Sequence, residues 1–300
     1  MPQYQKIMPF QDFLAKVIKY EIRIRKAVST QMQGSFRSVF KGSGLEFADI
    51  REYQYGDDLR LVDWNNTAKG HGTYVKVFRE EKEQTVFFLV DVSASQGVGV
   101  AGQSKLDAVK EICAVLAMSA IQEASHVGMC CFSDQKEKYI KPSNKLKHGY
   151  QIAVELFKLK PESVKTDLSK AILFTLNLLK RKSLVFVLSD FIDQNYDRHL
   201  KALARKHDVI VLHLYDELET KLPNLGIIPL YIAEQKRTVW VNTSSSDFQE
   251  KMQEIFNENR QKIEQLCKEL QANYLSIESK EDYVPKLIKL FKIRNRTAVV

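Results

Sequence analysis

The sequence predicts an α/β protein with a doubly wound, mostly parallel six-strand sheet and a smaller β-rich lobe. Two observations lead to this fold class. From residue 84 onward, short and almost wholly apolar runs alternate with segments of helical periodicity. Apolar strands separated by helices are typical of a parallel sheet that is covered on both faces. Residues 35–82 and 216–243 break this rhythm, because they consist of short β-like runs and turn residues.

The apolar runs and the helical periodicity give each element an approximate position. The expected strands are Thr85–Val90, His126–Phe132, Glu137–Ile140, Leu184–Leu188, Asp208–Leu214 and Tyr274–Ile277. We expect the short strand near Glu137–Ile140 to lie at an edge and to run antiparallel. The expected helices are residues 9–32, Leu106–Ala124, Tyr150–Leu159, Asp167–Lys180, Asn195–Arg205, Asp247–Gln271 and Val284–Ile293.

The chain divides into two expected parts. Residues 1–82 hold an N-terminal helix and a β-rich segment, and residues 83–300 form the α/β domain with a β-hairpin inserted at 216–243. Isolated two-stranded hairpins are only marginally stable in water. We therefore expect the segment 35–82 and the inserted hairpin to pack together as the smaller β-rich lobe.

Composition limits the class of protein. The 300 residues are 44% hydrophobic, which is ample for a packed core. No apolar run approaches the roughly 20 residues of a membrane span, and the first residues lack a signal-peptide pattern, so we expect a cytoplasmic protein without a membrane span. The net charge of +8 comes from dispersed basic residues, and we expect no nucleic-acid partner. None of the four cysteines forms a C-x-x-C pair, which predicts free, buried thiols.

The polar residues that follow the apolar run 86–90 are the clearest functional signal. Asp91, Ser93 and Ser95 stand at alternate positions after it, and their oxygens can converge on a hard cation such as Mg²⁺. Thr166 and Asp190 lie in two other loops on the same expected sheet edge, where ligands bind in open α/β sheets. The alternative is that these residues only form turns and helix caps, which aspartate and serine often do.

Together, Asp91, Ser93, Ser95, Thr166 and Asp190 resemble the metal-ion-dependent adhesion site of von Willebrand factor type A domains. The resemblance implies direct cation binding by the hydroxyl groups and binding through water by the two aspartates. It implies Mg²⁺, with Mn²⁺ or Ca²⁺ as alternatives, and leaves open whether the cation is always bound. It also implies a protein partner that offers an Asp or Glu to the metal. Lys165 departs from the glycine that often precedes the threonine, and we expect Lys165 to point to solvent.

An upstream block of sequence is similar to that of the bacterial domain-of-unknown-function family fifty-eight, whose members carry it just before a type A domain. The similar residues are Gly42–Phe47, Arg51–Tyr53, Gly56–Arg60, Asp63–Trp64, Tyr74–Lys76 and, downstream, Tyr215–Glu219. The resemblance implies a MoxR-type AAA+ ATPase as a partner. Within the block, we expect Arg51 or Arg60 to pair with Asp63 above a packed Trp64, with a partner-docking surface as the alternative.

These observations predict a non-enzymatic, divalent-cation-dependent protein-binding module that acts as an adaptor or assembly factor. The alternative is a metal-dependent, phosphatase-like hydrolase that uses the Asp91 loop. Haloacid-type phosphatases carry a second acid where this chain has Ser93, and no convincing general base accompanies the set. We expect Asp91 to face solvent at its strand end, so that Asp91→Ala would abolish partner binding and leave the fold largely intact.

Overall fold

The central sheet has six strands in the order β12-β9-β8-β3-β6-β7. It is seen in a computed structural model that describes residues 9–29, 45–70, 72–80, 84–100, 102–232 and 236–297. All neighbouring strands are parallel except β6 and β7, which pair antiparallel at one edge. The strands are β3 Thr85–Asp91, β6 His126–Phe132, β7 Lys136–Ser143, β8 Leu184–Ser189, β9 Asp208–Tyr215 and β12 Asn273–Glu278. The predicted α/β class, with its six-strand, mostly parallel sheet, and the antiparallel edge strand are confirmed.

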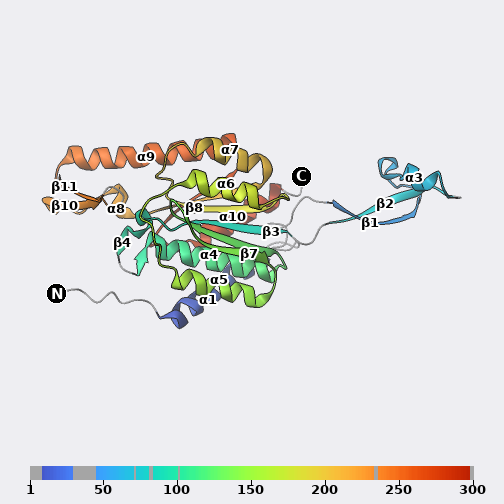
Figure 1. The fold of residues 1–300 in the computed structure, drawn as a ribbon, viewed down its shortest axis with the longest axis horizontal. Coiled ribbons are helices and arrows are strands. Elements are labelled where there is room, and N and C mark those ends of the chain that lie inside the picture. Colours follow the sequence, from blue (N-terminus) through green and yellow to red (C-terminus); the bar gives the residue numbers. More distant parts are fainter. Residues whose placement is uncertain are drawn as a thin grey trace.

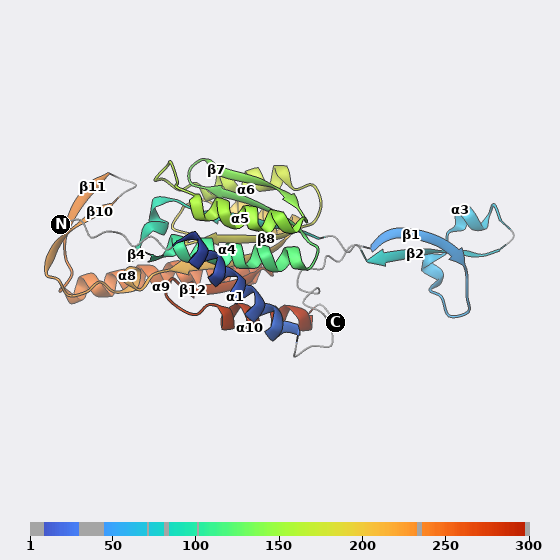
Figure 2. The same ribbon diagram turned by 90° about the horizontal axis from the view of Figure 1, so that it is seen from below.

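Helices cover both faces of the sheet (Figures 1 and 2). Alternate side chains of a strand point to opposite faces, so Val86, Phe88 and Val90 of β3 lie in one core cluster and Phe87 and Leu89 in another. The first cluster is completed by α1 Phe10–Ser29, α4 Lys105–Gln122, α5 Leu146–Lys158 and α10 Val284–Thr297. The second is completed by α6 Leu168–Leu178, α7 Asp197–Lys206 and α9 Ser246–Glu269. No helix within the described ranges is long and apolar enough to cross a bilayer.

The four cysteines are buried and free, as predicted. Cys113 and Cys131 lie in the first core cluster, and Cys130 and Cys267 in the second. Burial raises the pKa of Cys130 to about 12 and that of Cys267 to about 12. These thiols therefore stay protonated at neutral pH and act as apolar side chains that pack in the core.

Three two-stranded antiparallel sheets lie outside the central sheet in the described part of the chain, and the smallest pairs β4 Gly99–Val100 with β5 Gln103–Ser104 just before α4. The other two are longer hairpins. The strands β1 Leu45–Glu52 and β2 Tyr74–Glu80 form one, and the strands β10 Ile227–Ile232 and β11 Arg237–Asn242 form the insertion that the sequence predicts. The expected joint lobe is wrong, because Figures 1 and 2 show the two hairpins at opposite ends of the molecule. The inserted hairpin is instead anchored on α9: the Gln249 side chain donates hydrogen bonds to the carbonyl oxygens of Leu222 and Thr243 at 2.8 and 2.7 Å.

The helix α1 packs on α4 and α10 rather than on the β1–β2 hairpin. Phe13 and Val17 of α1 are buried in the first core cluster. By its contacts, α1 is therefore part of the α/β body. Residues 30–32 of the expected first helix and residues 42–44 of the upstream block lie outside the described residues.

The upstream block has pairings that differ from those expected. Arg51 makes a two-pronged ion pair with Asp57 at 2.6 and 2.7 Å, and Arg60 pairs with Asp58. Asp63 instead caps the short helix α3 Trp64–Thr67, by accepting hydrogen bonds from the N–H groups of its first turn. Trp64 is 70% exposed. The expected Asp63 pairing is wrong, because each arginine pairs with an aspartate that is closer in sequence. The expected packing of Trp64 is also wrong, since the side chain lies mostly in solvent.

Candidate functional site

The carboxyl ends of β3 and β8 bring two aspartates to one sheet edge. Because these strands are parallel neighbours, Asp91 at the end of β3 lies beside Ser189 at the end of β8. The Asp91 Oδ2 atom accepts a hydrogen bond of 2.6 Å from the Ser189 hydroxyl, and Oδ1 accepts one of 3.0 Å from the Ser93 N–H. Asp91 is fully buried and Asp190 is 1% exposed. The expectation that Asp91 faces solvent is wrong, because its side chain is fully buried and both of its oxygens accept hydrogen bonds from neighbouring residues.

That turn places the two serines of the motif together. Ser93 directly precedes the short 3-10 helix η2 Ala94–Gly97, and the hydroxyl oxygens of Ser93 and Ser95 lie 3.0 Å apart. The N–H of Ala94 donates to the carbonyl of Val164 at 3.2 Å, which brings the loop that carries Thr166 beside the turn. Thr166 is half-buried and Lys165 is exposed, as expected for Lys165.

Asp91 has an unusual acidity because of this environment. Burial and, second, the charge of Asp190 raise the pKa of Asp91 from 3.8 to about 7, against the opposing effect of hydrogen bonds from Ser189 and Ser93. Two carboxyl groups that are buried side by side resist being ionised together. A cation at this edge would relieve that repulsion.

A buried lysine also lies at this edge, and the sequence did not predict it. Lys105, the first residue of α4, is fully buried. Its Nζ atom lies 2.7 Å from Asp190 Oδ2 and 2.5 Å from Oε1 of Glu219, in the short helix α8 Glu217–Thr220. Burial lowers the pKa of Lys105, but the charges of Asp190 and Glu219 outweigh it and hold the pKa above its ordinary value. The ammonium therefore stays charged.

Gln96 adds an unsatisfied polar group to the same turn. It is fully buried, and neither its Nε2 nor its Oε1 has a hydrogen-bond partner within the described part of the chain. Buried polar atoms are nearly always satisfied in native proteins. An orphaned amide beside Ser95 is thus consistent with a water or a ligand in this region.

The donor set fits a hard cation in its chemistry. Hydroxyl and carboxylate oxygens are the ligands that Mg²⁺ and Ca²⁺ prefer. Among the described residues, no group of three His, Cys, Asp or Glu side chains is placed to hold a metal ion, so any site here depends on the serine and threonine hydroxyls. The ammonium of Lys105, which neutralises Asp190, is the one feature described above that opposes a cation.

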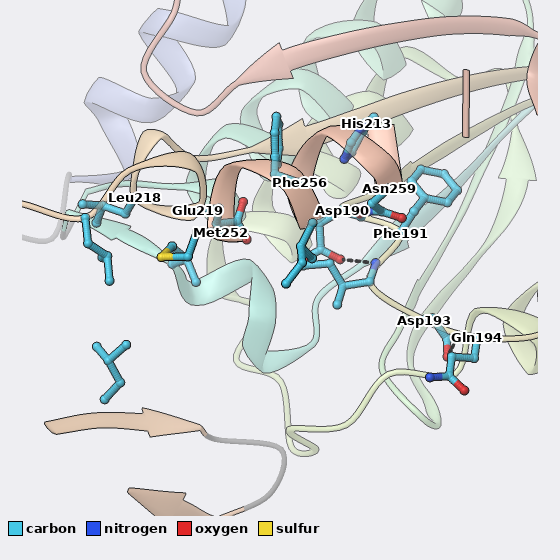
Figure 3. Close-up of a pocket in the computed structure, with 15 residues that line it drawn as sticks. Asp190, Phe191, Asp193, Gln194, His213, Leu218, Glu219, Met252, Phe256 and Asn259 are labelled. Atoms are coloured by element: carbon cyan, nitrogen blue, oxygen red, sulfur yellow. Dashed lines mark hydrogen bonds between the residues drawn. The ribbon is translucent and has the colours of Figure 1, made fainter. Parts of the chain in front are cut away.

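An apolar cleft begins at the same edge (Figure 3). Its volume is about 1050 Å³. Leu218 and Glu219 lie on one side of Asp190, and Asp193 and Gln194 on the other. Along α9 the cleft is lined by Met252, Ile255, Phe256 and Asn259, a spacing that places them on one face of the helix. The exposed Ile192 and Ile255 give this cleft an apolar rim next to the candidate cation site.

The pKa of Asp91 predicts a pH dependence of stability. A carboxyl whose pKa is higher in the folded protein holds its proton more tightly there, so stability falls as pH rises from about 4 to about 7. Asp91→Asn keeps the neutral shape and removes this titration. In EDTA, we expect the variant to gain on the order of 2 kcal/mol relative to the wild type across that range. Urea unfolding at several pH values measures it, and a constant difference between the two proteins would contradict it.

Comparisons with known proteins place the chain in a family. The family model "Protein of unknown function DUF58" matches residues 49–262. The uncharacterized protein Rv1480 of Mycobacterium tuberculosis is 25% identical over 217 residues, which cover 71% of this chain and 68% of that protein.

This chain is also similar to solved structures. The match to BatB from Bacteroides thetaiotaomicron has a TM-score of 0.45 at 12% identity and covers 71% of this chain and 99% of the BatB chain. The SpRpn10 VWA domain has a TM-score of 0.40 at 12% identity, over 68% and 93% of the two chains. Because the family model spans most of the sequence, this chain belongs to the DUF58 family of proteins of unknown function.

Proposed function

We propose that this protein is a non-enzymatic protein-binding module that contacts its partner through a divalent cation at the carboxyl ends of β3 and β8. One observation carries the proposal: Asp91 and Asp190 are buried at adjacent strand ends, beside the paired hydroxyls of Ser93 and Ser95. Mg²⁺ is the cation we favour, because it is bound by few protein oxygens and keeps some of its waters.

Within this proposal, Ser93, Ser95 and Thr166 would hold the cation through their hydroxyl oxygens. Asp91 would orient the turn through the Ser93 N–H and, like Asp190, would balance the charge of the cation. The cation would supply an open position for a carboxylate of the partner. The apolar cleft that starts at Asp190 supports a protein as the partner, since apolar surface next to a charged anchor is typical of protein interfaces.

A MoxR-type AAA+ ATPase is the partner that the family resemblance implies, and we propose it as the first to test. Binding of the purified ATPase to the purified chain should be measured with Mg²⁺ and with EDTA. We expect binding in Mg²⁺ and its loss in EDTA, with recovery when Mg²⁺ is added back. Asp91→Asn should weaken binding at least about tenfold, because one negative charge beside the cation is lost.

Asp197→Asn is the matched control. Asp197 pairs with Lys262 on the surface at 3.4 Å, and its substitution should leave binding unchanged. Equal binding in Mg²⁺ and EDTA, with no effect of Asp91→Asn, would contradict the proposed site. Hydrolysis of a phosphate ester that requires Mg²⁺ and disappears in Asp91→Asn would instead favour the hydrolase alternative.

A further inference from the structure

Lys105 occupies a position that a long, solvated side chain rarely takes. Lysine is almost never fully buried unless it is paired, and here one ammonium serves two carboxylates, those of Asp190 and Glu219. Such buried ion pairs lose much of their attraction to the cost of removing water from the charges. The buried ion pairs of Lys105 are therefore expected to contribute little to the stability of the fold. The contact between the ammonium and Asp190 then needs an explanation other than stability.

The charged and titratable groups around Asp190 define the environment of the ammonium. The carboxyl group of Asp91 lies beside Asp190, and that of Glu219 shares the ammonium with it. Asp216, which follows β9, is a further buried carboxyl at this edge, and it accepts hydrogen bonds from the Leu218 N–H and the Ser279 hydroxyl. His213 also lies beside Asp190, but burial lowers the pKa of His213 to about 4 and keeps it neutral. Lys105 is thus the positive charge that directly contacts Asp190.

We propose that Lys105 is a tethered cation that competes with a divalent metal ion for Asp190. This inference rests on the proposed cation site and adds a residue that sets its affinity. While the ammonium contacts Asp190, its positive charge repels a metal ion that approaches this carboxylate. The affinity for the metal ion is therefore lowered. When a metal ion binds, the ammonium leaves Asp190 and keeps its second partner, Glu219.

Glu219 makes the exchange possible and ties it to a second element. Its Oε1 atom binds the ammonium, and its Oε2 atom accepts a hydrogen bond of 3.0 Å from the N–H of Asp216 in the capping box of α8. Glu219 therefore holds a fixed place from which it can draw Lys105 away from Asp190. The helix α8 directly precedes the β10–β11 hairpin in the chain. The Lys105–Glu219 ion pair therefore links the cation site to the segment that leads into this hairpin.

Two substitutions should change cation affinity in opposite directions, which a purely structural role for the ion pair does not predict. Lys105→Met removes the competing charge and should raise the affinity for Mn²⁺ at least about tenfold. Glu219→Gln leaves the ammonium with Asp190 alone and should lower the affinity by a similar factor. Mn²⁺ binding to the full chain is measured by calorimetry and by the electron paramagnetic resonance of free Mn²⁺.

Matched controls separate this effect from general electrostatics and from misfolding. Lys170→Met removes a surface lysine that pairs with Asp167 near the same edge, and should change the affinity less than about twofold because the site is solvated. If Lys105→Met alone fails to fold, the double variant Lys105→Met/Glu219→Gln removes both charges. It should fold and should still bind Mn²⁺ more tightly than the wild type.

Each outcome decides a different claim. If the wild type binds Mn²⁺ and the Lys105 variants bind it equally well, the competition is overturned and the proposed function stands. If the wild type does not bind Mn²⁺ but Lys105→Met does, Lys105 holds the site and the proposed cation dependence of the wild type fails. If no protein binds Mn²⁺, both are overturned.

Discussion

Truncating Phe186 to alanine should lower the free energy of unfolding by about 3–5 kcal/mol. Phe186 is fully buried in β8, and its ring stacks on that of Phe88 in β3, with 5.1 Å between centroids and 14° between planes. The substitution would leave a cavity between the sheet and the helices of the first core cluster, where close packing prevents the surrounding side chains from filling it. Urea unfolding followed by circular dichroism measures the loss.

Ile255→Ala is the control for that result. Ile255 is 67% exposed on α9, so its truncation should change stability by no more than about 0.5 kcal/mol. Equal losses for the two variants would show that the β3–β8 contact does not form the centre of the core.

Gly99→Ala should destabilise the protein by about 2–4 kcal/mol, because it combines backbone strain with a clash. Gly99 has a φ of +127°, a conformation that side chains disfavour. An added Cβ would also lie 2.8 Å from the Cα of Ser104 and 3.1 Å from Oδ2 of Asp216. Ser104 caps α4 directly before Lys105, so the clash falls on the segment that positions the buried ammonium.

Gly97→Ala provides the comparison for Gly99. Gly97 lies two residues before Gly99, and its φ is not positive. A Cβ added at Gly97 would meet no other atom within 4 Å. We expect its thermal unfolding midpoint to stay close to that of the wild type. A midpoint for Gly99→Ala that is as high as that of Gly97→Ala would contradict the structure of this turn.

The sheet could be predicted from the sequence because its strands carry their own signal. The run Leu184–Leu188 is wholly apolar and appears as β8, extended by one residue to Ser189. Strands that are buried on both faces need such runs. The expected lobe was wrong because the sequence of a hairpin indicates only which of its residues pair with each other. It does not indicate which surface of the molecule the hairpin contacts, and this holds for β1–β2 and for β10–β11. For the inserted hairpin that surface was α9, reached through the side chain of Gln249.

The candidate site was only partly predictable. Asp91, Ser93 and Ser95 come at the end of a buried strand, and the structure joins them by hydrogen-bond contacts in one turn. That they hold a cation stays a prediction. Lys105 was missed because a lysine next to a helix is ordinarily solvated. One signal was present in the sequence: Ser104 and Asp107 form a capping box that starts α4 at Lys105, and a cation is unfavourable at the positive end of a helix. A lysine there needs a carboxylate, but the sequence does not show that Asp190 and Glu219 supply it.

The four buried cysteines can report local opening of the folded chain, because each thiol becomes accessible only when the core around it opens. A thiol reacts with an alkylating reagent only as an exposed thiolate, and all four are buried in the folded chain. Cys113 and Cys131 report on one side of the sheet, and Cys130 and Cys267 on the other. Mass spectrometry of the alkylated chain over time therefore resolves which helical layer detaches first, without any introduced label.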